Sequence, residues 1–374
     1  MFKKVAVALS GGIDSAISAL ILKQKGFNII GTFIRNWDTT DNRDSIEEDM
    51  NDAMWICDRL DIPFKEVNFK KEFWSDVVQH VIANSNVGFY SNPDIFYNEF
   101  IIFGSYFRYC RDQLNVDAIA TGHYIQSSYG AYLENFDLSK SVKLKEGTDK
   151  SKDQSYILCR ISQEALQRTM FPIGSYTKLK VKKIAQENFF DKLLNKKESF
   201  DICCMKSEKL CSFLSEYVLD KSGKFMDVDT NKIVGEHLGI HHWAVGQQCL
   251  NEYYVAANNS DNIVYVVSKK DHPALFCRSL ILTDVHWIVS EPAELIKNRL
   301  YSCKFRFVPN TSLLDCKLIY LPEGDIILLD ADEPLFAVAP GQYAVFYEND
   351  ECVGSAKISA TGPSDLFLNG NKDS

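Results

Sequence analysis

Several features that would indicate common protein classes are absent from this sequence of 374 residues. No apolar stretch approaches the ~20 residues that cross a bilayer, so we expect no spanning helix and no membrane partner. Residues 1–4 run directly into a strand-like segment, so we expect no signal peptide ahead of the fold. The net charge of −9 argues against a general nucleic-acid binder, because duplex affinity comes largely from phosphate neutralisation.

Cysteine occurs eleven times but never as a Cys-x-x-Cys pair, which argues against a conventional zinc ribbon or a thioredoxin-like site. Without an export signal, this cysteine content indicates a reducing compartment. His237, His241 and His242 lie close together, but no carboxylate or cysteine motif of known metal-ligand spacing accompanies them. We therefore predict no metal site.

Positive charge is not spread evenly along the chain, and one short stretch is rich in lysine. A lysine-rich helix is usually a solvated face, and that is the simplest interpretation here. The stretch contains Lys178, Lys180, Lys182, Lys183, Lys192, Lys196 and Lys197.

Length predicts more than one domain. Apolar strand-like segments at 5–9, 27–35, 64–69 and 118–122 alternate with helical patterns at 13–23 and 45–60. This alternation predicts an α/β domain with a parallel sheet over residues 1–210. Short segments punctuated by glycine then predict a small β-rich domain over 211–276, and alternating strands with turn signals predict a β-barrel over 277–374.

The motif Ser10-Gly-Gly-Ile-Asp-Ser15 follows the first strand and opens the first helix. Glycines at such a turn allow close backbone approach to a ligand, and a helix N-terminus attracts anions. We expect glycine geometry to be required at Gly12. The motif lacks the lysine of a Walker A loop. It resembles the pyrophosphate loop of the ATP pyrophosphatases, which cleave ATP between the α- and β-phosphates.

Further short segments follow this loop along the chain. Taken together and in this order, the loop and these segments resemble the tRNA-specific 2-thiouridylase family over nearly the whole chain. Asn36-Trp-Asp38 and Leu60-Asp-Ile-Pro-Phe64 are most similar to its mitochondrial branch. The other segments are Asn92-Pro-Asp-Ile95, Ala120-Thr-Gly-His-Tyr124, Lys152-Asp-Gln-Ser-Tyr-Ile-Leu158, Phe171-Pro-Ile-Gly174, Gly239-Ile-His241, Val245-Gly-Gln247 and Ala339-Pro-Gly-Gln342.

The resemblance implies ATP-dependent replacement of the C2 oxygen of the wobble uridine by sulfur. The oxygen is first adenylated, and a cysteine persulfide then delivers the sulfur. ATP and Mg²⁺ are the implied cofactors, and a tRNA anticodon stem-loop and a persulfide donor protein are the implied partners. The resemblance also implies a monomer in mitochondria, with the cytoplasm as the alternative location.

Carried over residue by residue, the resemblance gives Cys203 the persulfide position and His123 a role in orienting the base, with Asp14 as a catalytic or Mg²⁺-binding group. We expect the lysines between 178 and 183 to add charge for tRNA. The expected ATP-binding residues are Ala8, Leu9, Ser10, Gly11, Gly12, Ile13, Asp14, Ser15, Ile34 and Gly122. The expected tRNA-binding residues are Asn92, Pro93, Asp94, Lys152, Asp153, Gln154, Arg306, Phe307 and Gln342.

One position departs from the family. Where the family has a second cysteine, in Asn-Pro-Asp-Ile-x-Cys-Asn, this chain has Tyr97. That cysteine resolves the persulfide or helps to hold an iron–sulfur cluster in the family. Tyrosine cannot form a disulfide, and clusters are normally held by thiolates, so we do not expect a cluster. Cys204 and Cys110 are the candidates to replace it.

Two other functions stay open on the sequence. A small-molecule adenylating enzyme with the same loop would need an ammonia channel, a glutaminase domain or an amino-acid pocket, and would have no use for Cys203. A catalytically impaired tRNA-binding pseudoenzyme is suggested by Tyr97, although the intact loop weighs against it. Pyrophosphate exchange distinguishes the pseudoenzyme, and tRNA dependence distinguishes the small-molecule enzyme.

Overall fold

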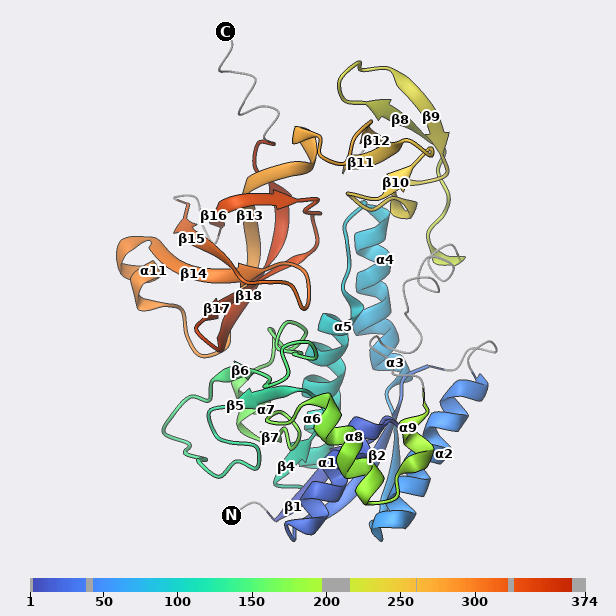
Figure 1. Cartoon of the computed structure of the whole chain (residues 1–374), viewed down its shortest axis with the longest axis vertical. Helices are drawn as coiled ribbons and strands as arrows, with labels where there is room; N and C mark the ends of the chain where they lie inside the picture. Colours follow the sequence, from blue (N-terminus) through green and yellow to red (C-terminus); the bar gives the residue numbers. More distant parts are fainter. Residues whose placement is uncertain (1–2, 38–42, 197–215, 260, 322–325, 365–374) are drawn as a thin grey trace. The chain divides into compact units, whose positions relative to one another are not determined.

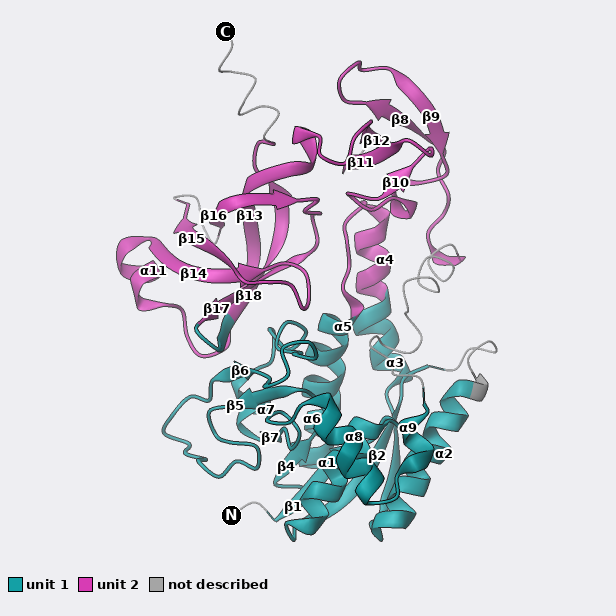
Figure 2. Cartoon of the chain, viewed as in Figure 1, with its two compact units in different colours: residues 1–78, 94–204, 349–353 teal, residues 79–93, 205–348, 354–374 magenta. Residues whose placement is uncertain are grey.

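The computed structural model describes residues 3–37, 43–196, 216–259, 261–321 and 326–364. The chain divides into two compact units (Figure 2). Unit 1 contains residues 1–78, 94–204 and 349–353, and unit 2 contains residues 79–93, 205–348 and 354–374. Among the described residues, no helix has the length and apolar character needed to cross a membrane.

Unit 1 is built on a five-stranded sheet in the order β3-β2-β1-β4-β7, and every neighbouring pair is parallel. Helices connect successive strands, and α1 packs against α2 and α8 (Figure 1). The strands are β1 (Lys4–Ala8), β2 (Asn28–Arg35), β3 (Phe64–Asn68), β4 (Ala118–Ala120) and β7 (Thr169–Met170). The main helices are α1 (Ile13–Gln24), α2 (Arg43–Leu60), α7 (Gln163–Gln167), α8 (Lys178–Glu187) and α9 (Asp191–Leu194).

The predicted parallel α/β sheet is confirmed, and its core follows from the sequence. Val5, Ala6 and Val7 are fully buried on consecutive positions of β1, as expected for a strand covered on both faces. Between β3 and β4 the chain is mainly helical and contains two π-helical stretches that the periodicity did not predict. These segments are α3 (Lys70–Phe73), η1 (Trp74–Val78), α5 (Pro93–Phe96), η2 (Tyr97–Tyr106) and α6 (Phe107–Asp112).

A hairpin of β5 (Ile125–Ser127) and β6 (Leu144–Glu146) completes unit 1. Residues 349–353 also belong to this unit, since Glu351 and Cys352 pair with β6.

Unit 2 contains two β structures. The first is a sheet in the order β10-β11-β12-β8-β9, whose core includes Phe225, Val255 and Val264. Its segments are β8 (Gly223–Asp227), β9 (Ile233–His237), the 3₁₀ turn η3 (Ile240–His242), β10 (Gln248–Cys249), β11 (Tyr253–Asn258) and β12 (Ile263–Val267). Helix α4 (Gln79–Asn86) belongs to this unit and contacts η3.

The second β structure is a barrel. Its strands follow the order β13-β16-β15-β14-β17-β18, and pairing of β13 with β18 closes it. The segments are η4 (Pro273–Leu275), β13 (Phe276–Trp287), α11 (Ala293–Asn298), β14 (Leu300–Arg306), β15 (Leu314–Tyr320), β16 (Ile327–Phe336), β17 (Tyr343–Glu348) and β18 (Glu351–Thr361). The predicted C-terminal β-barrel is therefore confirmed. The boundaries 1–210, 211–276 and 277–374 stay a prediction.

Candidate functional site

The loop between β1 and α1 requires glycine at Gly11. Gly11 has φ +72°, and a Cβ there would lie 2.4 Å from the backbone oxygen of Asp49 in α2. Gly12 has φ −97°, and among the described residues its Cβ would meet only the Ser10 hydroxyl, at 3.3 Å. The expectation that Gly12 needs glycine geometry is therefore wrong, since φ −97° is ordinary for any residue. The constraint lies one residue earlier, where α2 approaches the loop.

The serine side chains of the loop hold its shape. The Ser15 hydroxyl donates to the Gly12 carbonyl at 3.0 Å and accepts the Ser10 N–H at 3.2 Å. Among the described residues, no side chain caps the N-terminus of α1. Because the first N–H groups of a helix have no partner within it, this end is suited to bind a phosphate group.

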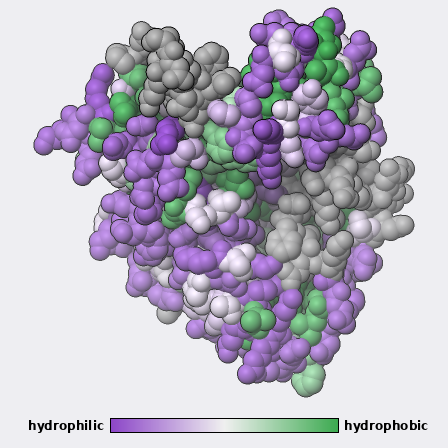
Figure 3. Space-filling model, turned by 45° about the horizontal axis from the view of Figure 1, so that its top comes forward, coloured by the Kyte–Doolittle hydropathy of each residue, from purple (hydrophilic) through white to green (hydrophobic). Residues whose placement is uncertain are grey.

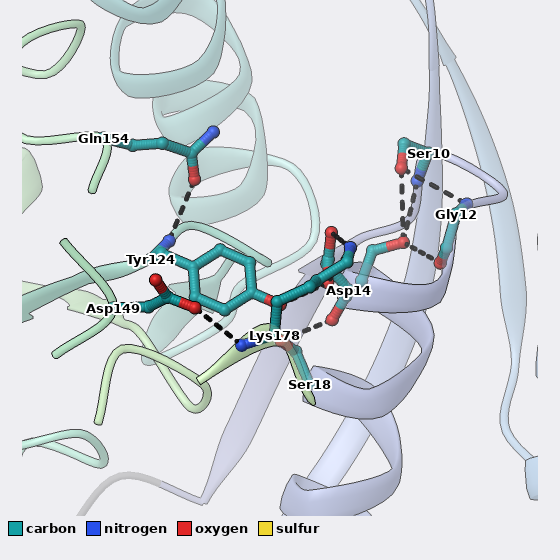
Figure 4. A network of polar contacts seen from close by, with 9 residues as sticks. Ser10, Gly12, Asp14, Ser18, Tyr124, Asp149, Gln154 and Lys178 are labelled. Atoms are coloured by element: carbon teal, nitrogen blue, oxygen red, sulfur yellow. Dashed lines mark hydrogen bonds and ion pairs between the residues drawn. The ribbon is translucent and has the colours of Figure 1, made fainter. Parts of the chain in front are cut away.

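An ion pair between a buried lysine and the partly exposed Asp14 lies at the same helix end (Figure 4). Lys178 Nζ donates to the two carboxylate oxygens of Asp14 at 2.9 and 2.7 Å, and the Tyr124 hydroxyl donates to Asp14 Oδ1 at 2.6 Å. Lys178 is only 8% exposed, and its backbone N–H donates to Asp149 at 2.9 Å. Segments far apart in the sequence thus place the Asp14 carboxylate and the Lys178 ammonium group beside the loop.

A second cluster holds the loop from the side of α2. Lys196 Nζ lies 2.6 Å from Asp49 and 2.5 Å from Asp52, and it donates to the Gly11 carbonyl at 3.3 Å. Burial alone would raise the pKa of Asp52, but hydrogen bonds from Lys192 and Lys196 lower it below its usual value. Burial raises the pKa of Asp49 despite its bond to Lys196.

The lysine-rich stretch is therefore not one solvated face. Lys178 is buried against Asp14, and Lys196 is paired with Asp49 and Asp52. Only part of the stretch, including Lys180 and Lys183, is exposed. The prediction of a solvated face is wrong for Lys178 and Lys196. Lys197 lies outside the described residues.

The other expected nucleotide contacts lie where parallel strands end. Gly122, just beyond β4, is close to the start of α1, since a Cβ there would lie 2.8 Å from the Ser15 nitrogen. Leu9 and Ile13 are buried, while Ala8 and Ile34 are partly exposed on β1 and β2. In sheets of this type, ligands bind beyond the carboxyl ends of the strands.

His123 follows Gly122 and carries a neutral ring at neutral pH. Burial lowers the pKa of His123 to about 4. Its Nδ1 lies 2.9 Å from the Thr121 hydroxyl, and its ring centroid lies 5.9 Å from that of Phe103. The imidazole is thus fixed in orientation at the edge of the sheet that carries the loop.

Family profiles match the chain in three consecutive blocks. A profile described as the tRNA methyl transferase HUP domain matches residues 3–207, and one described as the tRNA methyl transferase PRC-barrel domain matches residues 211–270. One described as the aminomethyltransferase beta-barrel domain matches residues 277–358. The mitochondrial tRNA-specific 2-thiouridylase 1 of Drosophila melanogaster is 39% identical over 372 residues, covering 97% of this chain and 95% of that protein.

This chain is a member of the tRNA-specific 2-thiouridylase family. The human mitochondrial tRNA-specific 2-thiouridylase 1 is 38% identical and covers 98% of this chain and 92% of that protein. The tRNA-specific 2-thiouridylase MnmA of Blochmanniella floridana is 36% identical, covering 95% of this chain and 96% of that protein. The resemblance inferred from the motifs is therefore confirmed, as is the succession of a HUP domain, a PRC-barrel domain and a β-barrel.

The residues of unit 1 that are expected to contact tRNA differ in their exposure to solvent. Asp153 is buried and accepts the Gly147 N–H at 2.8 Å, while Gln154 accepts the Tyr124 N–H at 2.9 Å. These two side chains hold their own loop. Lys152 is partly exposed, and Asp94 lies in the first turn of α5. Their contact with tRNA stays a prediction.

The expected contacts in unit 2 are also engaged within it. Arg306 is 4% exposed and lies over the Tyr347 ring at 4.4 Å. Phe307 stacks on Phe305, and Gln342 accepts the Ala339 N–H at 2.8 Å. Asn92 is buried and Pro93 begins α5. Roles on tRNA for these residues likewise stay predictions.

The position that departs from the family is occupied by an ordered tyrosine. The Tyr97 hydroxyl accepts a hydrogen bond from Asn36 Nδ2 at 2.8 Å, and its ring lies 6.0 Å from that of Phe73. Cys203 and Cys204 lie outside the described residues. Cys110 is fully buried, and burial raises its pKa to about 12. Since the thiolate is the reactive form, Cys110 is poorly suited to replace the missing cysteine.

Sequence reasoning did not find the role of Lys178. One signal was available in its position, as Thr177 caps the N-terminus of α8 and makes Lys178 the first helical residue. A cation there is opposed by the helix dipole. A carboxylate partner offsets this cost, but the sequence does not say that the partner is Asp14.

Proposed function

We propose that this chain is an ATP-dependent tRNA 2-thiouridylase acting on the wobble uridine. The uridine O2 attacks the α-phosphorus of ATP, and pyrophosphate leaves. A terminal persulfide sulfur on Cys203 then attacks C2, and AMP leaves. A thiol finally attacks Cys203 Sγ and releases the thiocarbonyl base, leaving Cys203 in a disulfide with that thiol. Base chemistry in a stem-loop requires the uridine to leave its stack.

The observation that carries this proposal is the Asp14–Lys178 pair at the uncapped start of α1. The N–H groups of α1 and the Gly11–Gly12 turn provide donors for the departing pyrophosphate. Lys178 places its ammonium group beside this turn. Because the side chain is buried, water screens its charge only weakly. Stabilising charge that develops on a leaving group is usually the largest contribution to such a reaction.

Asp14 is also the residue here that fits Mg²⁺, since that ion prefers carboxylate and phosphate oxygens. When bound, Mg²⁺ would neutralise phosphate charge beside Lys178. No iron–sulfur cluster is part of the proposal, because Tyr97 is not a thiolate.

The remaining assignments follow from the family and from Tyr97. We propose that His123, as a neutral ring, orients the adenylated base. An external thiol takes the place of the family's second cysteine, and a persulfide donor protein loads Cys203. The relatives named as mitochondrial support a mitochondrial location, and the protein is proposed to act as a monomer.

Pyrophosphate release in the presence of tRNA tests this site. Lys178→Met removes the cation, and we expect a loss of at least about a hundredfold in the rate, within the range found for one electrostatic donor. Lys23→Met is the matched control, because Lys23 is an exposed lysine of the same unit that donates to the Asp61 carbonyl.

An unchanged rate in Lys178→Met would contradict the assignment of the site. Pyrophosphate release that does not depend on tRNA would favour a small-molecule adenylating enzyme instead. Tight tRNA binding without any pyrophosphate release by the unaltered protein would favour a pseudoenzyme.

A further inference from the structure

A cluster of two histidines and one aspartate lies in unit 2, apart from the residues assigned above. His241 and His242 belong to the turn η3, and Asp220 precedes β8. His242 Nε2 lies 2.8 Å from Asp220 Oδ1, and His241 Nε2 lies 3.5 Å from the same oxygen. Their potential ligand atoms all lie within 4.8 Å of one another. The fold thus supplies the carboxylate that the sequence spacing did not reveal.

The state of His241 is a second, independent indication of a ligand. Its side chain is only 4% exposed, and its buried Nε2 has no hydrogen-bond partner among the residues that the structure describes. That nitrogen faces Asp220 Oδ1 at a distance too long for a hydrogen bond. A buried polar atom without a partner is costly, so such an atom in a native protein calls for an explanation. A bound cation would supply the missing partner.

We propose that Asp220, His241 and His242 bind a divalent transition-metal ion, with zinc as the preferred occupant. Two imidazole nitrogens and one carboxylate oxygen are typical zinc ligands, and water can complete the tetrahedron. Bond lengths of about 2.0–2.1 Å place tetrahedral ligand atoms roughly 3.3 Å apart. The two separations from Asp220 Oδ1, 2.8 and 3.5 Å, lie on either side of that value.

The donor set also separates this site from the Mg²⁺ expected with ATP. Mg²⁺ prefers oxygen ligands and retains water, whereas imidazole favours zinc, copper and nickel. Asp220 is exposed, so an ion can enter from solvent. Binding would join the segment before β8 to the η3 turn, which makes the site structural within this β-rich sheet.

Titration of the full-length protein with Zn²⁺ and with Co²⁺ tests the proposal. Accessible thiols are first blocked with iodoacetamide, so that cysteines do not compete, and Mg²⁺ serves as the comparison ion. We expect one Zn²⁺ equivalent by calorimetry, a Co²⁺ visible spectrum without thiolate charge-transfer bands, and a higher Tm with Zn²⁺ but not with Mg²⁺.

Asp220→Asn and His242→Asn each remove one of the proposed zinc ligands. Neither residue belongs to the hydrophobic core, so we expect both variants to fold. We expect each to weaken Zn²⁺ binding at least about tenfold and to abolish the Tm increase, while Tm in EDTA stays as in the unaltered protein. His272→Asn is the control, because His272 pairs with Asp229 at 3.1 Å outside the cluster. Equal Zn²⁺ affinity in all of these proteins, or no binding by the unaltered protein, would overturn the proposal.

Discussion

In the loop between β1 and α1, backbone geometry distinguishes two adjacent glycines. Gly11 has a positive φ and lies against the Asp49 backbone, whereas Gly12 has an ordinary φ. We expect Gly11→Ala to lower the free energy of unfolding by about 2 kcal/mol or more, since alanine disfavours this conformation and its Cβ would contact backbone. Gly12→Ala, at the helix N-cap, should cost less than about 1 kcal/mol. Chemical denaturation of both variants measures the difference, and equal losses would contradict it.

A second residue-level prediction concerns His123. Its pKa is lowered from 6.5 to about 4, so between these pH values the unfolded chain binds a proton that the folded protein does not. The free energy of unfolding therefore rises with pH across this window, by at most about 1.4 kcal/mol per pH unit from this group.

His123→Asn should remove that contribution. The measurement is the difference between the unfolding free energies of the two proteins at several values between pH 4 and pH 7. Other titrating groups cancel in this difference, as long as the substitution does not alter them. A difference that does not vary with pH would show that His123 is not desolvated.

Single residues also show what the sequence could and could not provide. The motif Ser10-Gly-Gly-Ile-Asp-Ser15 predicted the loop, because its chemistry is contained in adjacent residues. The partner of Asp14 was not predictable, since Lys178 lies 164 residues away and only the fold brings them together. The proximity of Asp220 to the histidines was not predictable for the same reason. It lies 22 residues from His242, and this separation matches no known metal-ligand spacing.

At the scale of elements, helix α8 carries its lysines in two environments. Lys178 is buried at its start, while Lys180 and Lys183 are exposed and Lys182 is partly exposed. We expect replacement of Lys180, Lys182 and Lys183 by alanine to weaken tRNA binding. Each lost phosphate contact should lower the slope of log affinity against log salt by roughly one.

The measurement is tRNA affinity at several salt concentrations, with Lys23→Ala as the matched control. Lys178 is left unchanged in this variant, so that pyrophosphate release reports separately on the ATP site. An unchanged slope in the triple variant would place tRNA elsewhere on the protein.

Regular elements were predictable where hydrophobic periodicity was strong. Helix α2 was expected over 45–60 and spans Arg43–Leu60, and β3 was expected over 64–69 and spans Phe64–Asn68. The π-helical η2 was not predicted, because no simple sequence period distinguishes it from an α-helix. Tyr97 begins this stretch, so the position that departs from the family also starts an irregular element.

For the whole molecule, the α/β sheet and the C-terminal barrel were predictable from the order of patterns along the chain. Contacts between distant segments were not predictable. Residues 79–93 belong to unit 2 and residues 349–353 to unit 1, although their neighbours in sequence lie in the other unit. Local patterns carry no information on such exchanges, because they depend on packing between segments far apart in the chain.

The central claim is that this chain thiolates tRNA through ATP-dependent activation and Cys203. Its most direct test is quantification of 2-thiouridine in tRNA after incubation with ATP, Mg²⁺, a thiol reductant and a persulfide donor, with pyrophosphate measured in parallel. We expect the unaltered protein to form both products, Cys203→Ser to release pyrophosphate without forming 2-thiouridine, and Tyr97→Phe to behave nearly as the unaltered protein. Absence of 2-thiouridine with the unaltered protein, or its undiminished formation by Cys203→Ser, would contradict the account.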